Sequence, residues 1–205
     1  MARWGSDSNS AIIPAECINR FLKEAEKETY RGFGLVGFQT YDLLDPTMRS
    51  FLKMPDNIQY GVYVNEVYNL GTGSEELKAG DVILSIDGKT LNPYGRYLHE
   101  QYDRISFENL ILQKTDGDGL QFEIWRDGQK QMIDVIARNF KADEMLVPYY
   151  LFGKQPEYLV TGGFICQQMT RDYLTMWGDG WQGKVPPHLL HYYRDMAFKP
   201  TEDRK

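Results

Sequence analysis

Short runs of the chain are rich in β-branched and aromatic residues, and several place apolar residues at alternate positions, which is typical of β-strands. These runs cover residues 35–40, 60–68, 82–86, 120–126 and 129–138. Asp-Gly pairs at residues 87–88 and 127–128 follow the third and fourth runs, and Asp-Gly is a strong signal for a tight hairpin turn. In the third run we expect Val82, Leu84 and Ile86 to face the core.

Apolar residues spaced by three or four positions predict the helices. The clearest case is residues 14–27, where Ile18, Phe21, Leu22 and Ala25 share one face and Pro14 suits the first helical position. Further helices are expected over 45–54, capped by Asp45, over 105–114, opened by Ser106, and over 187–198, with a short turn of helix at 74–78. The polar, tyrosine-rich residues 92–104 have no clear period and are predicted to form an inserted loop.

Composition places the chain among globular proteins, because 42% of its 205 residues are hydrophobic and 25% are charged. The net charge is 23 − 29 = −6, and this acidic excess argues against nucleic-acid binding, which depends on basic side chains. No apolar stretch approaches the roughly 20 residues that span a bilayer, so no membrane span is expected. Residues 1–10 include Asp7 and lack an apolar h-region, so no signal peptide is expected either.

No metal or cofactor site is predicted. Cys17 and Cys166 are too few for a disulfide framework and are expected to be packed thiols. His188 and His191 have the spacing of a metal pair, but no carboxylate is placed beside them, so a surface or packing role is favoured. Residues 116–119 begin like a calcium loop and lack its later ligands, so a plain turn is the better interpretation.

The character of the chain changes after residue 140. Pro148, Pro156 and the Gly162-Gly163 pair interrupt it, and strand-like residues 158–168 follow the second of these prolines. We therefore expect a domain boundary within residues 140–156.

Residues 77–88, Leu-Lys-Ala-Gly-Asp-Val-Ile-Leu-Ser-Ile-Asp-Gly, are closely similar to an element of the PDZ domains in HtrA/Deg (protease Do-like) serine proteases. Residues 11–14 (Ala-Ile-Ile-Pro), the helix after them and residues 30–33 (Tyr-Arg-Gly-Phe) resemble the junction between the trypsin-like barrel and the first PDZ domain of that family. Residues 147–156, 162–165 and 173–174 resemble the plant branch and its bacterial relatives, in which a second, degenerate PDZ domain begins at this point.

The resemblance covers nearly the whole chain from residue 11. It implies a mainly β fold with short helices (α+β), namely a PDZ-like, partly open β-barrel or sandwich followed by an incomplete second PDZ-like unit. The implied domains are residues 1–29, the end of a trypsin-like barrel and a linker helix; residues 30–140, a PDZ domain; residues 141–156, a linker; and residues 157–205, the N-terminal part of a second, degenerate PDZ domain.

The resemblance also implies a peptide site, because PDZ domains add a peptide C-terminus as a strand and hold its carboxylate with backbone amides. The implied carboxylate loop consists of Arg31, Gly32, Phe33, Gly34 and Leu35, in which the glycines would let three N–H groups converge and Arg31 would add charge. The implied groove lies between a strand with Val36, Gly37 and Phe38 and the helix at 105–114. On that helix Ile111 and Lys114 are expected to face the peptide, and Phe107 and Leu110 the core. The helical period leaves the reverse split open, and a glycine turn without a ligand is the alternative for the loop.

A catalytic triad is not predicted in this chain. The family's Gly-Asn-Ser-Gly-Gly type of nucleophile motif does not occur, residues 5–10 are only a superficial likeness, and the first histidine is His99. We therefore expect the non-enzymatic, regulatory part of a serine endopeptidase. Its implied partners are peptide or protein C-termini, unfolded polypeptide, the parent's protease domain and further copies in a homo-oligomer. The alternative is a PDZ scaffold for assembly with an occluded groove, including one from a catalytically dead relative. The bacterial members imply a periplasmic or otherwise exported protein.

Overall fold

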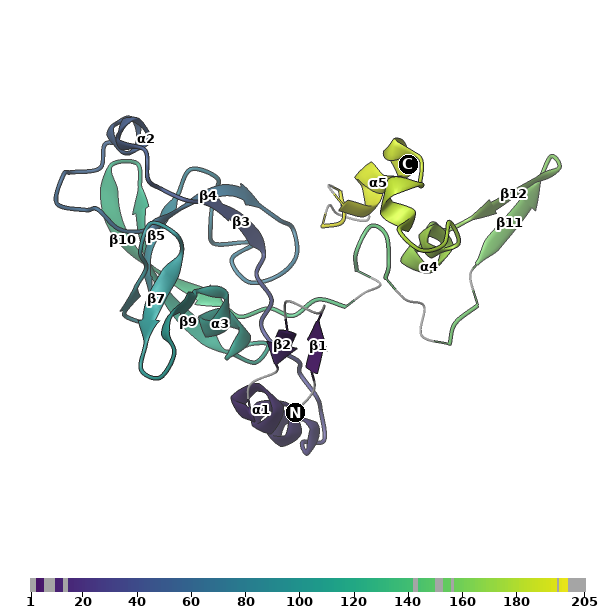
Figure 1. Ribbon diagram of the computed structural model, residues 1–205, viewed down its shortest axis with the longest axis horizontal. Coiled ribbons are helices and arrows are strands. Elements are labelled where there is room, and N and C mark those ends of the chain that lie inside the picture. Colours follow the sequence, from purple (N-terminus) through teal and green to yellow (C-terminus); the bar gives the residue numbers. More distant parts are fainter. Residues whose placement is uncertain are drawn as a thin grey trace. The chain divides into compact units, whose positions relative to one another are not determined.

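The computed structural model describes residues 3–5, 10–12, 15–141, 144–149, 153–155, 157–194 and 196–198 (Figure 1). The helices are α1 (Ala15–Ala25), α2 (Pro46–Phe51), α3 (Glu108–Leu112), α4 (Arg171–Thr175) and α5 (Pro187–Arg194), with a 3-10 turn η1 (Trp181–Gly183). The strands are β1 (Arg3–Gly5), β2 (Ser10–Ile12), β3 (Phe38–Tyr41), β4 (Val62–Val67), β5 (Val82–Ile86), β6 (Lys89–Thr90), β7 (Arg96–His99), β8 (Asp103–Ser106), β9 (Gly119–Arg126), β10 (Gln129–Ile136), β11 (Tyr158–Thr161) and β12 (Phe164–Gln167). The predicted class, mainly β with short helices, is confirmed.

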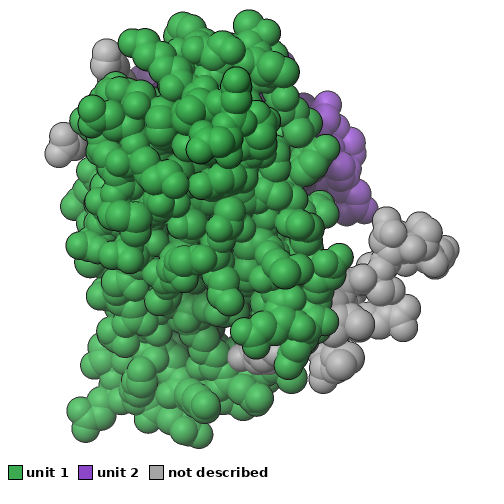
Figure 2. Space-filling model, turned by 90° about the vertical axis from the view of Figure 1, so that its left-hand side faces the viewer, with its two compact units in different colours: residues 1–67, 71–139 green, residues 68–70, 140–205 purple. Residues whose placement is uncertain are grey.

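The chain divides into two compact units. Unit 1 comprises residues 1–67 and 71–139, and unit 2 comprises residues 68–70 and 140–205. In Figure 2 unit 1 is the continuous green body, and it contains the main sheet. Unit 2 contains a separate two-stranded hairpin and short helices.

An antiparallel sheet in the order β10-β9-β5-β4-β3 organises unit 1, and β6 pairs with β5. Both predicted Asp-Gly turns are confirmed, at residues 87–88 between β5 and β6 and at 127–128 between β9 and β10. The φ angles are 47° and 73° in the first turn and 53° and 78° in the second, the positive values that the commonest two-residue hairpin turn requires. Among the described residues the sheet does not close into a barrel, and β3 is one of its edges.

Strand β5 is buried on both faces. Ile83 and Ile86 join the main core, whereas Val82 and Leu84 pack in a second cluster built on residues 43–58. A register shift after Ile83 changes which side chains point to each face. The expected burial of Val82, Leu84 and Ile86 is therefore confirmed, and the three side chains divide between two clusters because residues 43–58 cover the second face of the strand.

The segment that covers this second face is held by α2 and by a buried arginine. Asp45 caps α2 as predicted, and its side chain accepts a hydrogen bond from the Thr47 amide at 2.8 Å. Arg49 donates to the carbonyl oxygens of Ile58 at 2.9 Å and Leu43 at 2.5 Å. Burial lowers the pKa of Arg49. These bonds tie both ends of the segment to α2.

Residues 92–104 contain a hairpin, so the prediction of an inserted loop is wrong. Strands β7 and β8 pair in an antiparallel register from Arg96 opposite Ser106 to His99 opposite Asp103. The side chain of Tyr97 is buried, and its hydroxyl donates to Asn109 Oδ1 at 2.9 Å. The alternation was missed because each strand is four residues long and the other side chains of β7 are polar or exposed.

Three further predicted boundaries need correction. Strand β3 begins at Phe38, and the residues before it make only isolated bridges. Helix α3 begins at Glu108, because Ser106 belongs to β8. Residues 73–76 form turns in place of the expected helix. Helix α1 is confirmed from Ala15, whereas the predicted helical position of Pro14 lies outside the described residues.

A buried ion pair joins the start of β5 to the end of β9. Arg126 donates to both carboxylate oxygens of Asp81, Nε to Oδ1 and Nη2 to Oδ2, each at 2.7 Å. Asp81 Oδ2 also accepts from the Lys78 amide at 2.8 Å, and Arg126 Nη2 donates to the carbonyl of Glu76 at 2.9 Å. The hydrogen bond to Asp81 raises the pKa of Arg126. The pair therefore fixes the turn at residues 73–81 to the sheet.

Unit 2 consists of an exposed hairpin and a small helical core. Strands β11 and β12 pair with each other around the Gly162-Gly163 turn, and all their side chains are exposed. Figure 1 shows this hairpin extending from the helices of the same unit. The core contains Leu174, Trp181 and Val185, and the Thr170 side chain caps α4 by accepting from the Tyr173 amide at 3.2 Å.

Two further observations concern the surface. None of the helices in the described part of the chain is long and apolar enough to cross a membrane. Cys17 and Cys166 are exposed free thiols, so the expectation of packed thiols is wrong. Cys17 belongs to α1, and Cys166 belongs to β12, whose side chains are all exposed.

Candidate functional site

The predicted carboxylate loop lies against the C-terminal end of α3. Phe33 forms an antiparallel bridge with Thr115, just beyond the helix. A Cβ atom on Gly34 would lie 2.8 Å from the carbonyl oxygen of Ile111, so only glycine permits this close approach of the loop to the helix. Gly32 is buried, has a φ of 81° and makes the turn that brings the chain there.

Amides of this loop already donate to protein carbonyls. The Gly34 amide donates to Lys114 at 2.8 Å, the Leu35 amide to Arg138 at 2.9 Å and the Gly37 amide to Thr72 at 2.9 Å. Each of these N–H groups has a single hydrogen to offer. The expected convergence of three loop amides on one anion therefore does not include Gly34 or Leu35 in this structure, because both complete the backbone pairing of unit 1.

Helix α3 buries more of its apolar surface than expected. Ile111 has 0% exposure and packs in the main core together with Phe107 and Leu110. Leu112, which is 44% exposed, is the large apolar side chain that the helix presents to solvent. Ile111 was expected to face a peptide, and the structure places its side chain in the core, because the loop and the sheet enclose it from both sides.

Lys114, the other residue expected to face a peptide, is paired elsewhere. Its Nζ lies 2.7 Å from Asp87 Oδ2, in the turn between β5 and β6. Its charge is therefore directed to that turn.

The strand side of the predicted groove is the outer edge of β3. Phe38 is buried, stacks on Phe107 at 5.7 Å between ring centroids and meets Phe122 edge-on. Val36 is half-buried and forms a parallel bridge with Thr72, and Gly37 is buried. Because the sheet ends at β3, its outer backbone groups are unpaired by any described strand.

Arg31 of the loop is committed to local acceptors. Its guanidinium lies 3.4 Å from Glu24 Oε1 and 3.6 Å from Asp118 Oδ1, and it donates to the Asp116 carbonyl at 3.1 Å. Glu24 is the buried side chain of α1 and also pairs with Lys27, whose hydrogen bond lowers the pKa of Glu24. Arg31 therefore fastens α1 to the turn at residues 116–118.

Arg20 is a basic residue at this site that sequence reasoning missed. From α1 it donates to the carbonyl of Leu112 at 2.5 Å and to Thr115 Oγ1 at 3.4 Å, and its guanidinium lies 5.1 Å from the centre of the Phe33 ring. Burial lowers the pKa of Arg20, and the nearby acidic groups Asp118 and Glu24 act against that shift. No sequence signal links Arg20 to Leu112, because 92 positions separate them.

The two carboxylates of the predicted turn at residues 116–119 accept hydrogen bonds from backbone amides. Asp118 Oδ2 accepts from the Thr115 amide at 2.9 Å within the turn, and Asp116 Oδ1 accepts from the Asn139 amide at 2.8 Å and ties the turn to the chain after β10. In the described part of the chain no group of three or more His, Cys, Asp or Glu side chains is arranged to hold a metal ion.

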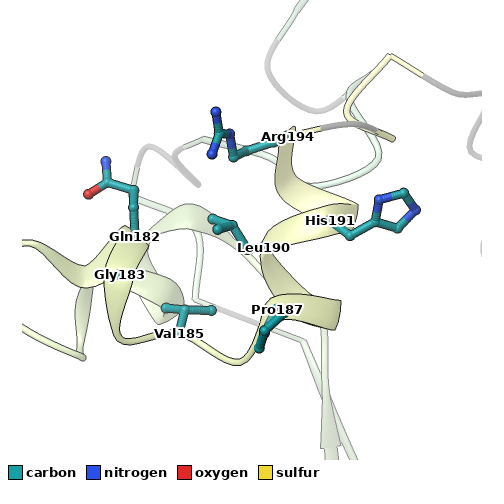
Figure 3. Close-up of a pocket in the computed structure, with 7 residues that line it drawn as sticks. All are labelled: Gln182, Gly183, Val185, Pro187, Leu190, His191 and Arg194. Carbon is teal, nitrogen blue, oxygen red and sulfur yellow. The ribbon is translucent and has the colours of Figure 1, made fainter.

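Unit 2 has a small open hollow of about 230 Å³ beside α5 (Figure 3). Val185, Leu190 and Pro187 form its apolar part, and Arg194, His191 and Gln182 lie around it.

Two segments of the chain match a known domain family. The PDZ domain family matches twice, over residues 34–136 and over residues 147–204. The chain belongs to this family, and the fold is that of a PDZ domain. The second match begins within the predicted linker, at residue 147.

The relatives in which this region occurs are HtrA/Deg-type proteases. Protease Do-like 2, chloroplastic, of Arabidopsis thaliana is 34% identical over 155 residues, which cover 75% of this chain and 25% of the relative. Protease Do-like 4, mitochondrial, from the same plant is 26% identical, covering 82% of this chain and 32% of the relative. A serine protease HtrA-like of Staphylococcus haemolyticus is 30% identical, with 60% and 18% covered. The chain thus spans about a third or less of these curated relatives.

Solved structures give a looser likeness. The HtrA-type protease AlgW with tripeptide has a TM-score of 0.43 and 22% identity, and the match covers 66% of this chain and 43% of that one. The same protease with decapeptide has a TM-score of 0.42 and 20% identity, over 64% and 38%.

Proposed function

We propose that this chain is the regulatory PDZ region of an HtrA/Deg-type serine endopeptidase, and that unit 1 binds hydrophobic C-termini or unfolded segments by strand addition. The observation that carries the proposal is the unpaired outer edge of β3 in a sheet whose family binds peptides in this way. Protease activity belongs in this proposal to the parent, and the exported compartment stays a prediction.

The edge of β3 and helix α3 have different roles in the proposed groove. Backbone groups along β3 would pair with the peptide backbone regardless of its sequence. Specificity then depends on exposed apolar side chains of the groove, and Leu112 is the one that α3 presents to solvent. A peptide with apolar residues near its C-terminus matches this surface.

Calorimetric titration with heptapeptides that end in valine tests the proposal. Leu112→Glu is expected to weaken binding about tenfold, because it places a charge beside an apolar contact. Leu98→Glu is the matched control, since Leu98 is also exposed but lies on β7, and it is expected to bind like the wild type. Equal affinity of all three proteins, or no binding by the wild type, would contradict the proposal.

Substitution of Gly34 cannot test this site. A side chain there would collide with the backbone of α3, so loss of binding would report loss of the fold.

A second candidate is a PDZ scaffold for assembly, with a groove that takes no peptide. The engagement of the Gly34 and Leu35 amides by protein carbonyls favours it. Under this alternative, arrays of C-terminal peptides return no ligand, and light scattering of the same chain shows an oligomer.

A further inference from the structure

Arg31 within the loop at residues 31–34 and Lys114 beside it are both paired with carboxylates. Lys114 is paired with Asp87 at 2.7 Å, and Arg31 with Glu24 at 3.4 Å and Asp118 at 3.6 Å. Arg20 is different, because no carboxylate of the described residues lies within ion-pair distance of it.

The partners that Arg20 does have are neutral. One guanidinium nitrogen donates to the Leu112 carbonyl and another to Thr115 Oγ1, while the Phe33 ring lies 5.1 Å away. A guanidinium carries five N–H donors, so these bonds leave donors for a further acceptor. Within the described part of the chain Arg20 is thus a partly desolvated cation without an ion pair, and the carboxylates nearest in effect, Asp118 and Glu24, act on it only from beyond ion-pair distance.

The position of Arg20 matters because of what surrounds it. Carbonyl groups at the C-terminal end of a helix carry partial negative charge and disfavour an anion there. The amides of Gly34 and Leu35 could offset this negative charge, but they donate to the backbone carbonyls of Lys114 and Arg138. A carboxylate that approaches this end of α3 therefore needs a positive charge from elsewhere.

We propose that Arg20, on the helix that precedes the PDZ domain, binds the terminal carboxylate of the peptide ligand at the end of α3. The guanidinium would hold the carboxylate through charge-assisted hydrogen bonds while it remains bonded to Leu112. This assignment rests on the proposed function, since it names the group that recognises the ligand's end. It also makes α1 part of the binding site, so that a bound ligand directly contacts a helix that lies outside the sheet.

Two peptides separate this role from a structural one. The probes are a heptapeptide ending in valine with a free carboxylate and the same heptapeptide with a C-terminal carboxamide. Fluorescence polarisation with the full chain is expected to show that Arg20→Gln weakens binding of the acid peptide about tenfold or more and leaves the amide peptide unchanged. Lys23→Gln removes the same charge from an exposed position on α1 and is expected to change neither affinity.

Arg20→Lys controls for loss of the fold. It keeps the positive charge of Arg20 and loses only the planar pair of donors. It is expected to retain part of the preference for the acid peptide. Equal weakening of both peptides by Arg20→Gln, or unchanged binding of the acid peptide, would overturn the assignment of Arg20 and leave the peptide site in place. Failure of the wild-type chain to bind either peptide would overturn the proposed function and this role with it.

Discussion

The two hairpin regions of the molecule differ in what covers them. In unit 1 the β9–β10 hairpin belongs to the main sheet, and β5, which pairs with β9, is buried on both faces. In the described part of unit 2 the strands of the β11–β12 hairpin pair only with each other, and Phe164 and Ile165 are each 73% exposed. Isolated two-stranded hairpins are marginally stable in water. The same local pattern therefore produces a core in one unit and an uncovered apolar surface in the other.

Strand pairing and burial of side chains therefore have separate structural requirements. Pairing needs a turn and two short strands, and both regions have these. Burial needs further layers, which residues 43–58 and α3 supply in unit 1. In the described part of unit 2 the buried apolar cluster is helical and small, and it does not include the hairpin.

The largest expected effect comes from the two cores. Phe122→Ala should destabilise unit 1 by about 3–5 kcal/mol, because it leaves a cavity where the ring has 0% exposure. Hydrogen exchange should then accelerate in β5 and β9 and remain unchanged in α4. Leu174→Ala is the reciprocal variant in unit 2 and should affect α4 alone. If either substitution loosens both units equally, the two units are one cooperative body.

A smaller loss is expected at the ion pair that supports the sheet of unit 1. Asp81→Asn should cost about 3 kcal/mol in urea denaturation, because it leaves the half-buried guanidinium of Arg126 without its buried counter-charge. Glu123→Gln, which removes a more exposed pair with Lys130, should cost less than about 1 kcal/mol. Equal costs for the two substitutions would show that burial of the Asp81 pair is not what makes it stabilising.

The smallest change in stability is expected on the hairpin of unit 2. Replacement of Phe164 and Ile165 by serine should leave the unfolding free energy within about 0.5 kcal/mol, because neither side chain is buried. The same replacement should lower the binding of a hydrophobic dye and any self-association seen by light scattering. A marked loss of stability would show that these side chains are covered in solution.

Local signals predicted much of the fold. The Asp-Gly pairs at 87–88 and 127–128, the cap at Asp45 and the apolar period of α1 all act within a few residues, and each predicted element is present. The hairpin at β7–β8 was missed because its strands are too short to show a period. The two-sided burial of β5 was missed because it depends on residues 43–58, which are distant in sequence.

The candidate site shows the same division. Glycines at 32 and 34 indicated a special loop, and the structure gives each a reason, a positive φ for one and contact with α3 for the other. Which side of α3 is buried was not predictable, because its apolar residues occupy adjoining rows. Arg20 gave no signal at all, since its partners Leu112 and Thr115 follow it by more than 90 positions.

Sequence alone was enough for most strands of the main sheet, for its two Asp-Gly turns and for the resemblance to PDZ regions of HtrA/Deg proteases, because residue pattern and spacing carry that information. Only the three-dimensional arrangement decided which charges are free. Lys114 and Arg31 carry the same charge as Arg20. They differ from Arg20 because the fold brings carboxylates within ion-pair distance of them. Ion pairing depends on proximity in space, and proximity is set by how the sheet, α1 and α3 pack together.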